Sequence, residues 1–210
     1  MIYTISFFII YYFLKIVFRG EARGLHNYPR KGPFIAAFNH NSYMDILAIS
    51  LAINFRVHGL GKRELFEMPF LGWWLRKMNV HPIVRDAGDE KGFRHLLDLL
   101  KSGARLFISP EGTRKWKDGK PPRARTGFVR LAQLVKCPIV PVAISNTREI
   151  LAPNSYKIRF KKIVVRVGKP IYLPPVEVTL ENKQILQEQA NRVMNEVYKL
   201  VISPRKKKIV

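Results

Sequence analysis

Short apolar runs alternate with segments of helical periodicity along most of this chain, and this alternation constrains the fold more than any other feature. A chain that alternates strands and helices builds a mostly parallel sheet covered by helices. We therefore predict an α/β fold with a single mixed, mostly parallel sheet flanked by helices. The expected strands are 34–38, 56–60, 80–84, 105–108, 139–144 and one or two within 157–170, and the expected helices are 46–51, 69–78, 88–101, 127–135 and roughly 180–201.

The first residues form an almost wholly apolar segment, IYTISFFIIYYFLKIVF, at positions 2–18. At about 1.5 Å per residue, a helix of this length barely crosses a hydrocarbon core of roughly 30 Å. The sequence therefore leaves open whether the segment spans the bilayer or lies in one leaflet, and a buried core helix is the less favoured alternative. Lys15, Arg19 and Arg23 lie on its C-terminal side, which predicts that the rest of the chain stays at the cytoplasmic face of the cell membrane. We predict that residues 1–24 form an apolar membrane-anchoring or interfacial helix with a basic linker, and that residues 25–210 form one domain.

The charge of the chain points to an anionic partner. Lys and Arg number 37 against 15 Asp and Glu, which gives a net charge of +22. Such a surplus suits nucleic acid, anionic lipid headgroups or a phosphorylated substrate, and charge alone does not choose among them. Cys137 is the single cysteine, so no intrachain disulfide can form, which favours a reducing compartment.

Three polar clusters follow expected strands. They are NHNSYMD at 39–45, RDAGDE at 85–90 and SPEGTRK at 109–115. In open α/β sheets ligands bind beyond the carboxyl ends of the strands, so we expect the three clusters to lie at one site.

The first cluster contains a histidine and an aspartate, His40 and Asp45, five positions apart. On one continuous helix these side chains would diverge by about 140°, so they can meet only if His40 precedes the helix. Ser42 and Asp45 have the spacing of a capping box, which would start a helix at Ser42. The two residues could serve only as that cap, but the cap is compatible with a catalytic pair. A carboxylate beside His40 would fix its tautomer and leave the other ring nitrogen to take a proton from a hydroxyl.

The third cluster has groups that suit a phosphate. Residues 110–114 predict a tight turn that presents backbone N–H groups, the Thr113 hydroxyl and the Arg114 guanidinium. Arg85 and Arg125 are further candidates, and a surface turn with a solvated arginine is the alternative. The chain has no G-x-S-x-G elbow, no Walker loop and no Cys/His cluster with zinc spacing. These patterns together favour direct transfer to a hydroxyl of a phosphorylated acceptor. We expect His26, His58, His81 and His95, which lack a comparable carboxylate, to be surface or packing residues.

These motifs resemble the glycerophospholipid acyltransferase family, and within it the 1-acylglycerol-3-phosphate acyltransferases. His40 to Asp45 fits the H-x4-D block of the family, Glu111 to Arg114 fits its E-G-T-R block, and IVPVAI at 139–144 fits its proline-containing strand. The resemblance covers roughly residues 32–144, and the order of the blocks makes it specific. Ser109 departs from the family, which usually has phenylalanine at that position.

The resemblance implies that His40 is the general base, that Asp45 is its partner, and that residues 25–210 are an acyltransferase domain. It implies a fatty acyl thioester donor, either acyl-CoA or acyl carrier protein, and lysophosphatidic acid as acceptor, with no metal and no cofactor. Anionic membrane lipids are a further expected partner, and no nucleic acid is expected. The residues expected to shape the acceptor phosphate site are Arg85, Glu111, Gly112, Thr113 and Arg114, with Ser42 and Arg125 as further candidates.

Three alternatives stay open at this point. The same fold could act on another acceptor, such as lyso-ornithine lipid or glycerol 3-phosphate. A basic nucleic-acid-binding protein would explain the charge, but not the apolar N-terminus or the polar clusters after the strands. An inactive membrane-binding homologue is disfavoured because both His40 and Asp45 are present.

Overall fold

A computed structural model describes residues 1–84, 89–113, 121–152 and 155–201 of the chain. Within them the strands form one seven-stranded sheet in the order β1-β7-β6-β2-β5-β3-β4, in which β6 and β7 pair antiparallel and the other neighbours pair parallel. This confirms the predicted mixed, mostly parallel sheet. The strands are β1 Glu21–Arg23, β2 Phe34–Phe38, β3 His58–Lys62, β4 Val80–Ile83, β5 Arg105–Ile108, β6 Ile139–Ser145 and β7 Val164–Val167.

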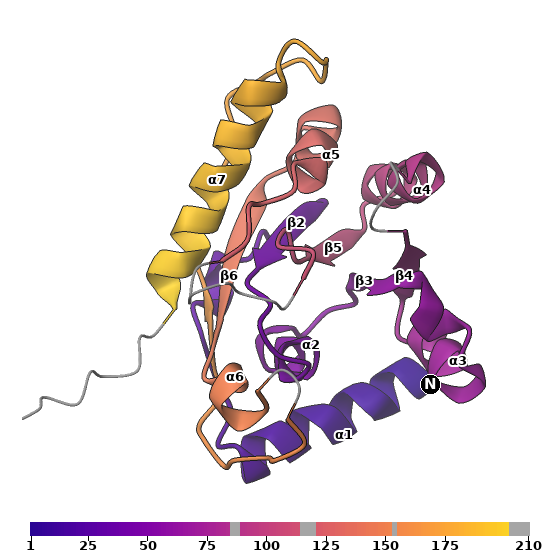
Figure 1. Cartoon of the computed structure of the whole chain (residues 1–210), viewed down its shortest axis with the longest axis vertical. Coiled ribbons are helices and arrows are strands. Elements are labelled where there is room, and N and C mark those ends of the chain that lie inside the picture. Colours follow the sequence, from indigo (N-terminus) through magenta and orange to yellow (C-terminus); the bar gives the residue numbers. More distant parts are fainter. Residues whose placement is uncertain (85–88, 114–120, 153–154, 202–210) are drawn as a thin grey trace, which may run out of the picture.

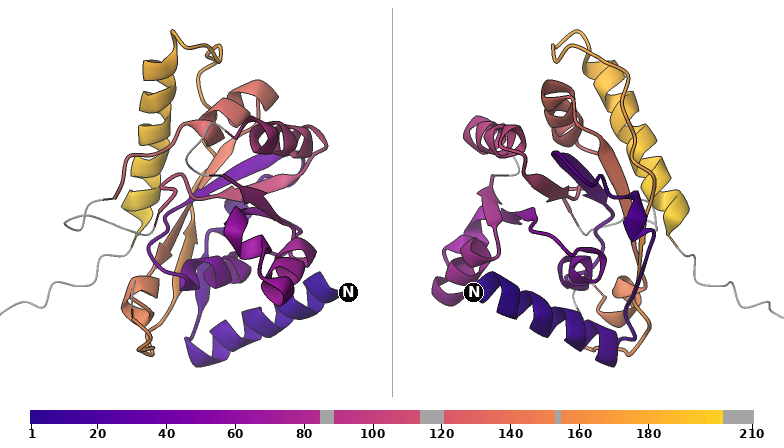
Figure 2. Two further views of the ribbon diagram at one scale, coloured as in Figure 1. Left: turned by 45° about the vertical axis from the view of Figure 1, so that its right-hand side comes forward. Right: turned by 180° about the vertical axis from the view of Figure 1, so that it is seen from behind.

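Helices cover both faces of the sheet (Figures 1 and 2). One core cluster joins the sheet to α1, α2 and the 3-10 turn that follows α2, and a second cluster joins the opposite face to α4, α5 and α7. The helices are α1 Ile2–Val17, α2 Met44–Ala48, α3 Pro69–Lys77, α4 Glu90–Lys101, α5 Gly127–Val135, α6 Thr147–Ile150 and α7 Lys183–Leu200, with 3-10 turns at Leu25–Asn27, Ile49–Ala52 and Arg63–Phe66.

Strand β2 lies between β6 and β5 and is buried along its whole length. Phe34, Ala36 and Phe38 face the cluster with α1 and α2, whereas Ile35 and Ala37 face the cluster with α4, α5 and α7. A strand buried on both faces requires apolar residues at every position, which explains its unbroken apolar run. The polar residues that follow β2 therefore emerge from the middle of the sheet.

Most of the expected elements are present, and the differences have local reasons. The bounds of β2, β5 and α5 agree with the prediction, but β3 begins two residues later than expected. Glycine occupies two of its five positions, which weakens the apolar pattern that marks a strand. Of the segment 157–170, only β7 is a strand, and residues 156–162 are exposed and form neither helix nor strand.

The N-terminal segment is a helix, α1, but it is not a buried core helix. Leu14 is its buried residue, and six of its large apolar side chains, those of Ile5, Phe8, Ile9, Tyr12, Phe13 and Ile16, are about half exposed or more. Within the described part of the chain, no helix has both the length and the hydropathy that crossing a bilayer requires. The expected basic linker after α1 contains an edge strand instead, because β1 pairs in parallel with β7.

Candidate active site

The turn after β2 is fixed to the neighbouring strand β6 by the side chain of Asn39. Its amide nitrogen donates to the carbonyl of Ile144 over 2.9 Å, and its oxygen accepts the N–H of Ile144 over 2.8 Å. This pair continues the strand pairing beyond the end of β2 through a side chain. The position of His40, the next residue, is therefore set by the sheet.

The carboxylate of Asp45 is buried and organises the turn. Its Oδ2 accepts the backbone N–H groups of Asn41 over 2.7 Å and Ser42 over 2.8 Å, and it lies 2.9 Å from Nδ1 of His40. Its Oδ1 accepts the hydroxyl of Thr147, the first residue of α6. Buried polar groups in stable proteins have such partners, so these donors account for a carboxylate in the core.

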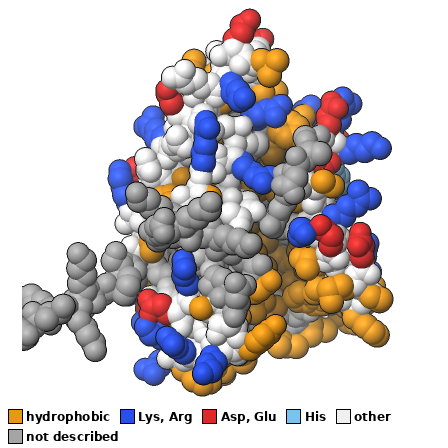
Figure 3. Space-filling view, in the orientation of Figure 1, with side chains coloured by type: hydrophobic (Ala, Val, Ile, Leu, Met, Phe, Trp, Pro, Cys, Tyr) orange, Lys and Arg blue, Asp and Glu red, His pale blue; other side chains and the backbone are white. Residues whose placement is uncertain are grey.

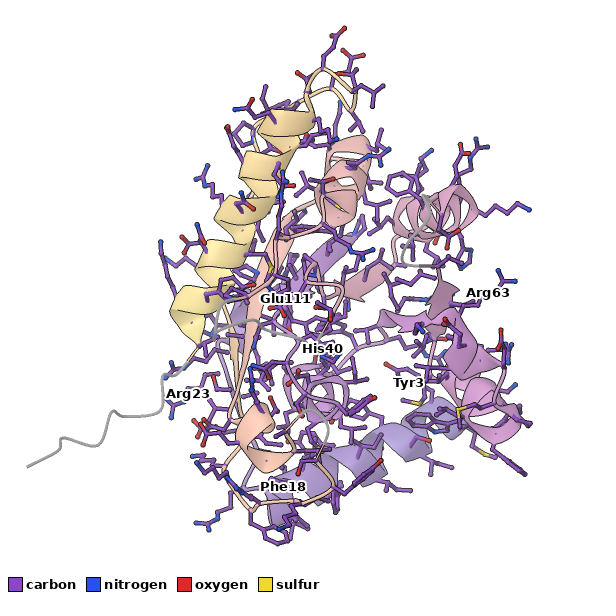
Figure 4. All side chains as sticks on the ribbon, in the orientation of Figure 1. Tyr3, Phe18, Arg23, His40, Arg63 and Glu111 are labelled. Atoms are coloured by element: carbon purple, nitrogen blue, oxygen red, sulfur yellow. The ribbon has the colours of Figure 1, made fainter. Side chains whose placement is uncertain are left out.

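The predicted contact between His40 and Asp45 is confirmed by this 2.9 Å distance. Because the carboxylate accepts from Nδ1, that nitrogen carries the ring proton, and Nε2 presents a lone pair. Nε2 forms no hydrogen bond with another described residue, and the ring lines a cavity. Figure 4 shows His40 near the centre of the molecule, and it follows the carboxyl end of the central strand β2. The geometry is that of a general base with its orienting carboxylate.

The predicted helix start at Ser42 is wrong, because α2 begins at Met44. The Ser42 hydroxyl donates to the carbonyl of Leu151 over 2.8 Å and accepts the N–H of Met44 over 3.2 Å. Of the expected capping box, the bond from the Ser42 N–H to the Asp45 carboxylate is present. Ser42 thus ties the turn to the chain after α6.

The turn after β5 is held by α7. Glu111 is buried, and its carboxylate accepts the hydroxyl of Tyr198 over 3.1 Å. Burial and the neighbouring Glu111 carboxylate raise the pKa of Tyr198 far above its ordinary value, so the hydroxyl keeps its proton and donates. Glu111 therefore lies inside the protein. Among the described residues that line the cavity beside His40, neither Glu111 nor Thr113 is present.

Gly112 allows Arg125 to approach this turn. Gly112 has φ +62°, and a Cβ at this position would lie 2.6 Å from Nε of Arg125. The backbone N–H of Arg125 also donates to the carbonyl of Pro110 over 2.9 Å. Gly112 and Arg125 both line the cavity that His40 lines. The structure thus brings Arg125 to the cavity that His40 lines.

A cavity of about 490 Å³ extends from His40 toward α1, and its walls are mainly apolar. Figure 3 shows hydrophobic side chains around a hollow in the lower right part of the molecule. Trp74 lines the cavity and donates to the hydroxyl of Ser6 over 3.1 Å, whereas Trp73 is half-exposed outside it. The walls nearest the N-terminus come from Tyr3, Phe7 and Ile10 of α1 and from Trp74, Leu75 and Met78 near α3.

Two of the predicted site residues, Arg85 and Arg114, lie outside the described residues. Two residues that donate hydrogen bonds to the predicted site residues could not be predicted from the sequence. Thr147 and Tyr198 lie 102 and 87 positions away from their partners, Asp45 and Glu111. Neither belongs to a recognisable motif, and no local pattern of the sequence could have identified them.

Three of the remaining histidines, which we expected to be surface or packing residues, contact one another at the edge of the sheet. Nδ1 of His58 lies 2.9 Å from Nε2 of His81, and Nδ1 of His81 lies 2.9 Å from Nε2 of His95. Burial, followed by the charges of His95 and His58, lowers the pKa of His81 to about 4. Within the described residues, no group of three or more His, Cys, Asp or Glu side chains could hold a metal ion.

Comparisons with known proteins place this geometry in a family. Residues 19–145 match the family model described as acyltransferase. The 1-acyl-sn-glycerol-3-phosphate acyltransferase of Bacillus subtilis is 28% identical over 83% of this chain and 87% of its own length. A chloroplastic 1-acyl-sn-glycerol-3-phosphate acyltransferase of Arabidopsis thaliana is 32% identical over 78% of this chain, which spans 45% of that longer protein.

A solved structure has the same architecture. The crystal structure of the 1-acyl-sn-glycerophosphate acyltransferase from Thermotoga maritima superposes with a TM-score of 0.70 at 25% identity. The match covers 96% of this chain and 83% of that one. The family model spans more than half of the chain and includes both His40 and Asp45. This chain therefore belongs to the acyltransferase family of enzymes.

Proposed function

We propose that this enzyme transfers a fatty acyl group from an acyl thioester to the sn-2 hydroxyl of lysophosphatidic acid, giving phosphatidic acid for phospholipid synthesis. The observation that carries the proposal is the 2.9 Å contact between His40 and Asp45 at the wall of an apolar cavity. The names of the relatives from Bacillus subtilis and Arabidopsis thaliana support this acceptor.

The chemistry follows from the tautomer of His40. Nε2 takes the proton of the acceptor hydroxyl while the hydroxyl oxygen attacks the carbonyl carbon of the thioester. The new C–O bond forms, the C–S bond breaks, and the leaving thiolate takes the proton back from the imidazolium as a free thiol. Asp45 stabilises the imidazolium and keeps the ring oriented throughout. No covalent acyl-enzyme is required.

The acceptor phosphate would bind near the turn after β5. Arg125 presents a planar guanidinium that suits bidentate contact with phosphate, and the absence of a side chain at Gly112 leaves room for it against the turn. Arg85 and Arg114 are proposed to complete this site. We assign Glu111 a positioning role, because its carboxylate is buried and bound to Tyr198.

The fatty acyl chain would occupy the apolar cavity. Its volume of about 490 Å³ falls in the range of ligand pockets, and its walls offer hydrocarbon contacts that extend to α1. The exposed apolar side chains of α1 would lie in the membrane interface, at the cytoplasmic face of the cell membrane. The lysophosphatidic acid acceptor and the phosphatidic acid product would lie in the same membrane. That no metal takes part and that no nucleic acid binds stay predictions.

An acceptor panel tests the proposal. The purified enzyme would receive labelled acyl-CoA or acyl carrier protein with lysophosphatidic acid, lyso-ornithine lipid or glycerol 3-phosphate, and mass spectrometry would locate the new ester. We expect transfer to the sn-2 hydroxyl of lysophosphatidic acid, from one or both donors. A faster reaction with another acceptor than with lysophosphatidic acid would reject lysophosphatidic acid as the preferred substrate.

The His40→Ala variant is the control for the mechanism. We expect it to fold and to lose transfer with every acceptor of the panel. A correctly folded His40→Ala variant with a near-wild-type rate would reject the mechanism.

A further inference from the structure

A surface segment between α6 and β7 carries large apolar side chains in contact with solvent. Residues 156–162, here called the 156–162 strip, are all exposed and form neither helix nor strand. Tyr156, Ile158 and Phe160 have exposed fractions of 99%, 56% and 74%. Single exposed apolar residues are common on soluble proteins, but a contiguous group of this kind indicates an interaction surface.

Cations alternate with these apolar side chains. Lys157 and Arg159 separate the three apolar residues, and neither forms an ion pair with another described residue. Lys161 and Lys162 extend the strip and pair with Glu149 and Glu21. The surface therefore combines apolar contact with a net positive charge.

The strip is tied to the rest of the fold by its backbone. The N–H of Arg159 donates to the carbonyl of Ile150 over 2.9 Å, and the side-chain amide of Asn146 donates to the carbonyl of Lys162 over 2.8 Å. The N–H of the following residue, Ile163, donates to the carbonyl of Phe18 over 3.2 Å. These bonds hold the strip against α6 and the end of α1.

The strip continues the exposed apolar side of α1. The ring of Phe160 stacks on Phe18 with centroids 5.9 Å apart, and Phe18 packs edge-on against Phe13 of α1 at 5.7 Å. Figure 1 shows this segment beside the C-terminal end of α1, and Figure 4 labels Phe18 at the junction. Phe13 belongs to a row of exposed α1 residues that includes Ile9 and Ile16. Helix and strip thus form one apolar surface.

We propose that the 156–162 strip is a second membrane-contacting element that binds anionic phospholipid together with α1. Tyr156, Ile158 and Phe160 would enter the boundary between headgroups and acyl chains, and Lys157 and Arg159 would bind lipid phosphates. The inference rests on the membrane location in the proposed function and adds a site that reads lipid charge. An acidic carrier protein is the other partner that a basic apolar patch could bind. The patch continues onto α1, so its apolar area is larger than a contact with one loop of a carrier protein would require. This favours a lipid surface as the partner.

Vesicle binding by the full chain tests the charged half of the strip. The Lys157→Gln/Arg159→Gln variant should bind phosphatidylcholine vesicles that contain phosphatidylglycerol about 30-fold more weakly than the wild type. Its binding to pure phosphatidylcholine should not change. The matched control is Lys183→Gln/Arg192→Gln on α7, which removes the same charge far from α1 and should leave both affinities nearly intact (Figure 1).

The apolar half has its own variant and control. Tyr156→Ser/Ile158→Ser/Phe160→Ser should lower binding to both kinds of vesicle by about tenfold or more. Leu180→Ser, an exposed residue before α7, is the control and should have no effect. Thermal unfolding would confirm that each variant is folded.

The outcomes separate this inference from the proposed function. With detergent-dispersed substrates, the strip variants should keep their rates within about twofold of the wild type. Strip variants that bind vesicles as tightly as the wild type would overturn the inference. Control variants that lose as much vesicle affinity as the strip variants would also overturn it. Lower affinity for acyl carrier protein with unchanged vesicle affinity would reassign the strip to a protein partner. Wild-type protein that binds vesicles but transfers no acyl group would reject the proposed function alone.

Discussion

The ends of β2 and β5 both supply site residues, but they are held in place in different ways. After β2, the His40 ring and the two backbone N–H groups of the turn bond to Asp45, within five positions of sequence. After β5, the turn is held by the bond from Tyr198 of α7 to Glu111 and by the bond from the Arg125 N–H to the carbonyl of Pro110. Gly112 leaves room for the Arg125 side chain beside the turn. The contact between His40 and Asp45 is short-range, although Ile144, Thr147 and Leu151 also bond to this end of β2. The site proposed for the phosphate, in contrast, is assembled from separate segments.

This difference predicts different consequences for substitution. At the end of β2, removing the central carboxylate should damage chemistry and stability together, because one group serves both. At the end of β5, the groups are spread over separate elements, so single changes should act mainly on acceptor binding. Three experiments test this contrast, and a fourth concerns the edge of the sheet.

The largest effect is expected for Asp45→Asn. The amide would face N–H donors in the core, so we expect a loss of about 3 kcal/mol in the free energy of unfolding and about 10³-fold in kcat. His40→Ala should lose a similar factor in kcat but less than about 1 kcal/mol in stability, since Asp45 keeps its other donors. Urea unfolding and transfer assays measure both. Equal stability of the two variants would contradict the shared role of Asp45.

A smaller effect on affinity is expected for Arg125→Gln. Loss of a charge-assisted contact with phosphate should raise KM for lysophosphatidic acid about 30-fold, with kcat within about threefold of the wild type. Arg125→Lys should recover part of the affinity, because it keeps the charge but not the bidentate geometry. A fall in kcat with an unchanged KM would place Arg125 in the chemistry of the β2 end instead.

Thr147→Val tests a long-range bond of the β2 end, the one that the Thr147 hydroxyl donates to Asp45. The valine keeps the shape but removes the hydroxyl that donates to Asp45. We expect a loss of about 1.5 kcal/mol in stability and a fall of about tenfold in kcat, both restored by Thr147→Ser. If serine does not restore the rate, the methyl group and not the hydroxyl supports the site.

The smallest effect concerns acid stability at the edge of the sheet, where His81 of the edge strand β4 contacts His58 of β3. The pKa of His81 is about 4 in the folded protein, against an ordinary value of 6.5. Between these pH values the unfolded chain binds a proton that the folded chain does not, so stability falls as pH decreases from 6.5 to 4. Because His81 is only partly buried, we expect a loss on the order of 1 kcal/mol.

Urea unfolding at several pH values measures this loss. A His81→Gln variant should show a shallower decline over the same range, because it has no imidazole to protonate. An unchanged decline would assign the acid sensitivity to other groups.

The contact between His40 and Asp45 could be predicted from the sequence because the two residues lie close together in the chain. The turn, the His40 to Asp45 contact and the central strands all follow from short patterns. The start of α2 was placed two residues too early, because the bonds of Ser42 to Met44 and Asp45 hold a turn that precedes the helix. β1 was missed because three residues in a basic segment form a strand only by pairing with β7. Arg125 was one weak candidate among many cations, and its place beside Gly112 required the fold.

The sequence by itself determined the α/β class, the buried central strand and the contact between His40 and Asp45. Each of these depends on periodicity or on contacts a few residues apart, which the chain carries locally. Only the tertiary structure decided which distant groups complete the site and which apolar residues stay exposed beside α1. Thr147, Tyr198 and the 156–162 strip owe their positions to the packing of helices on the sheet. Contacts between positions many tens of residues apart leave no pattern in one sequence, because their geometry exists only once the sheet has formed.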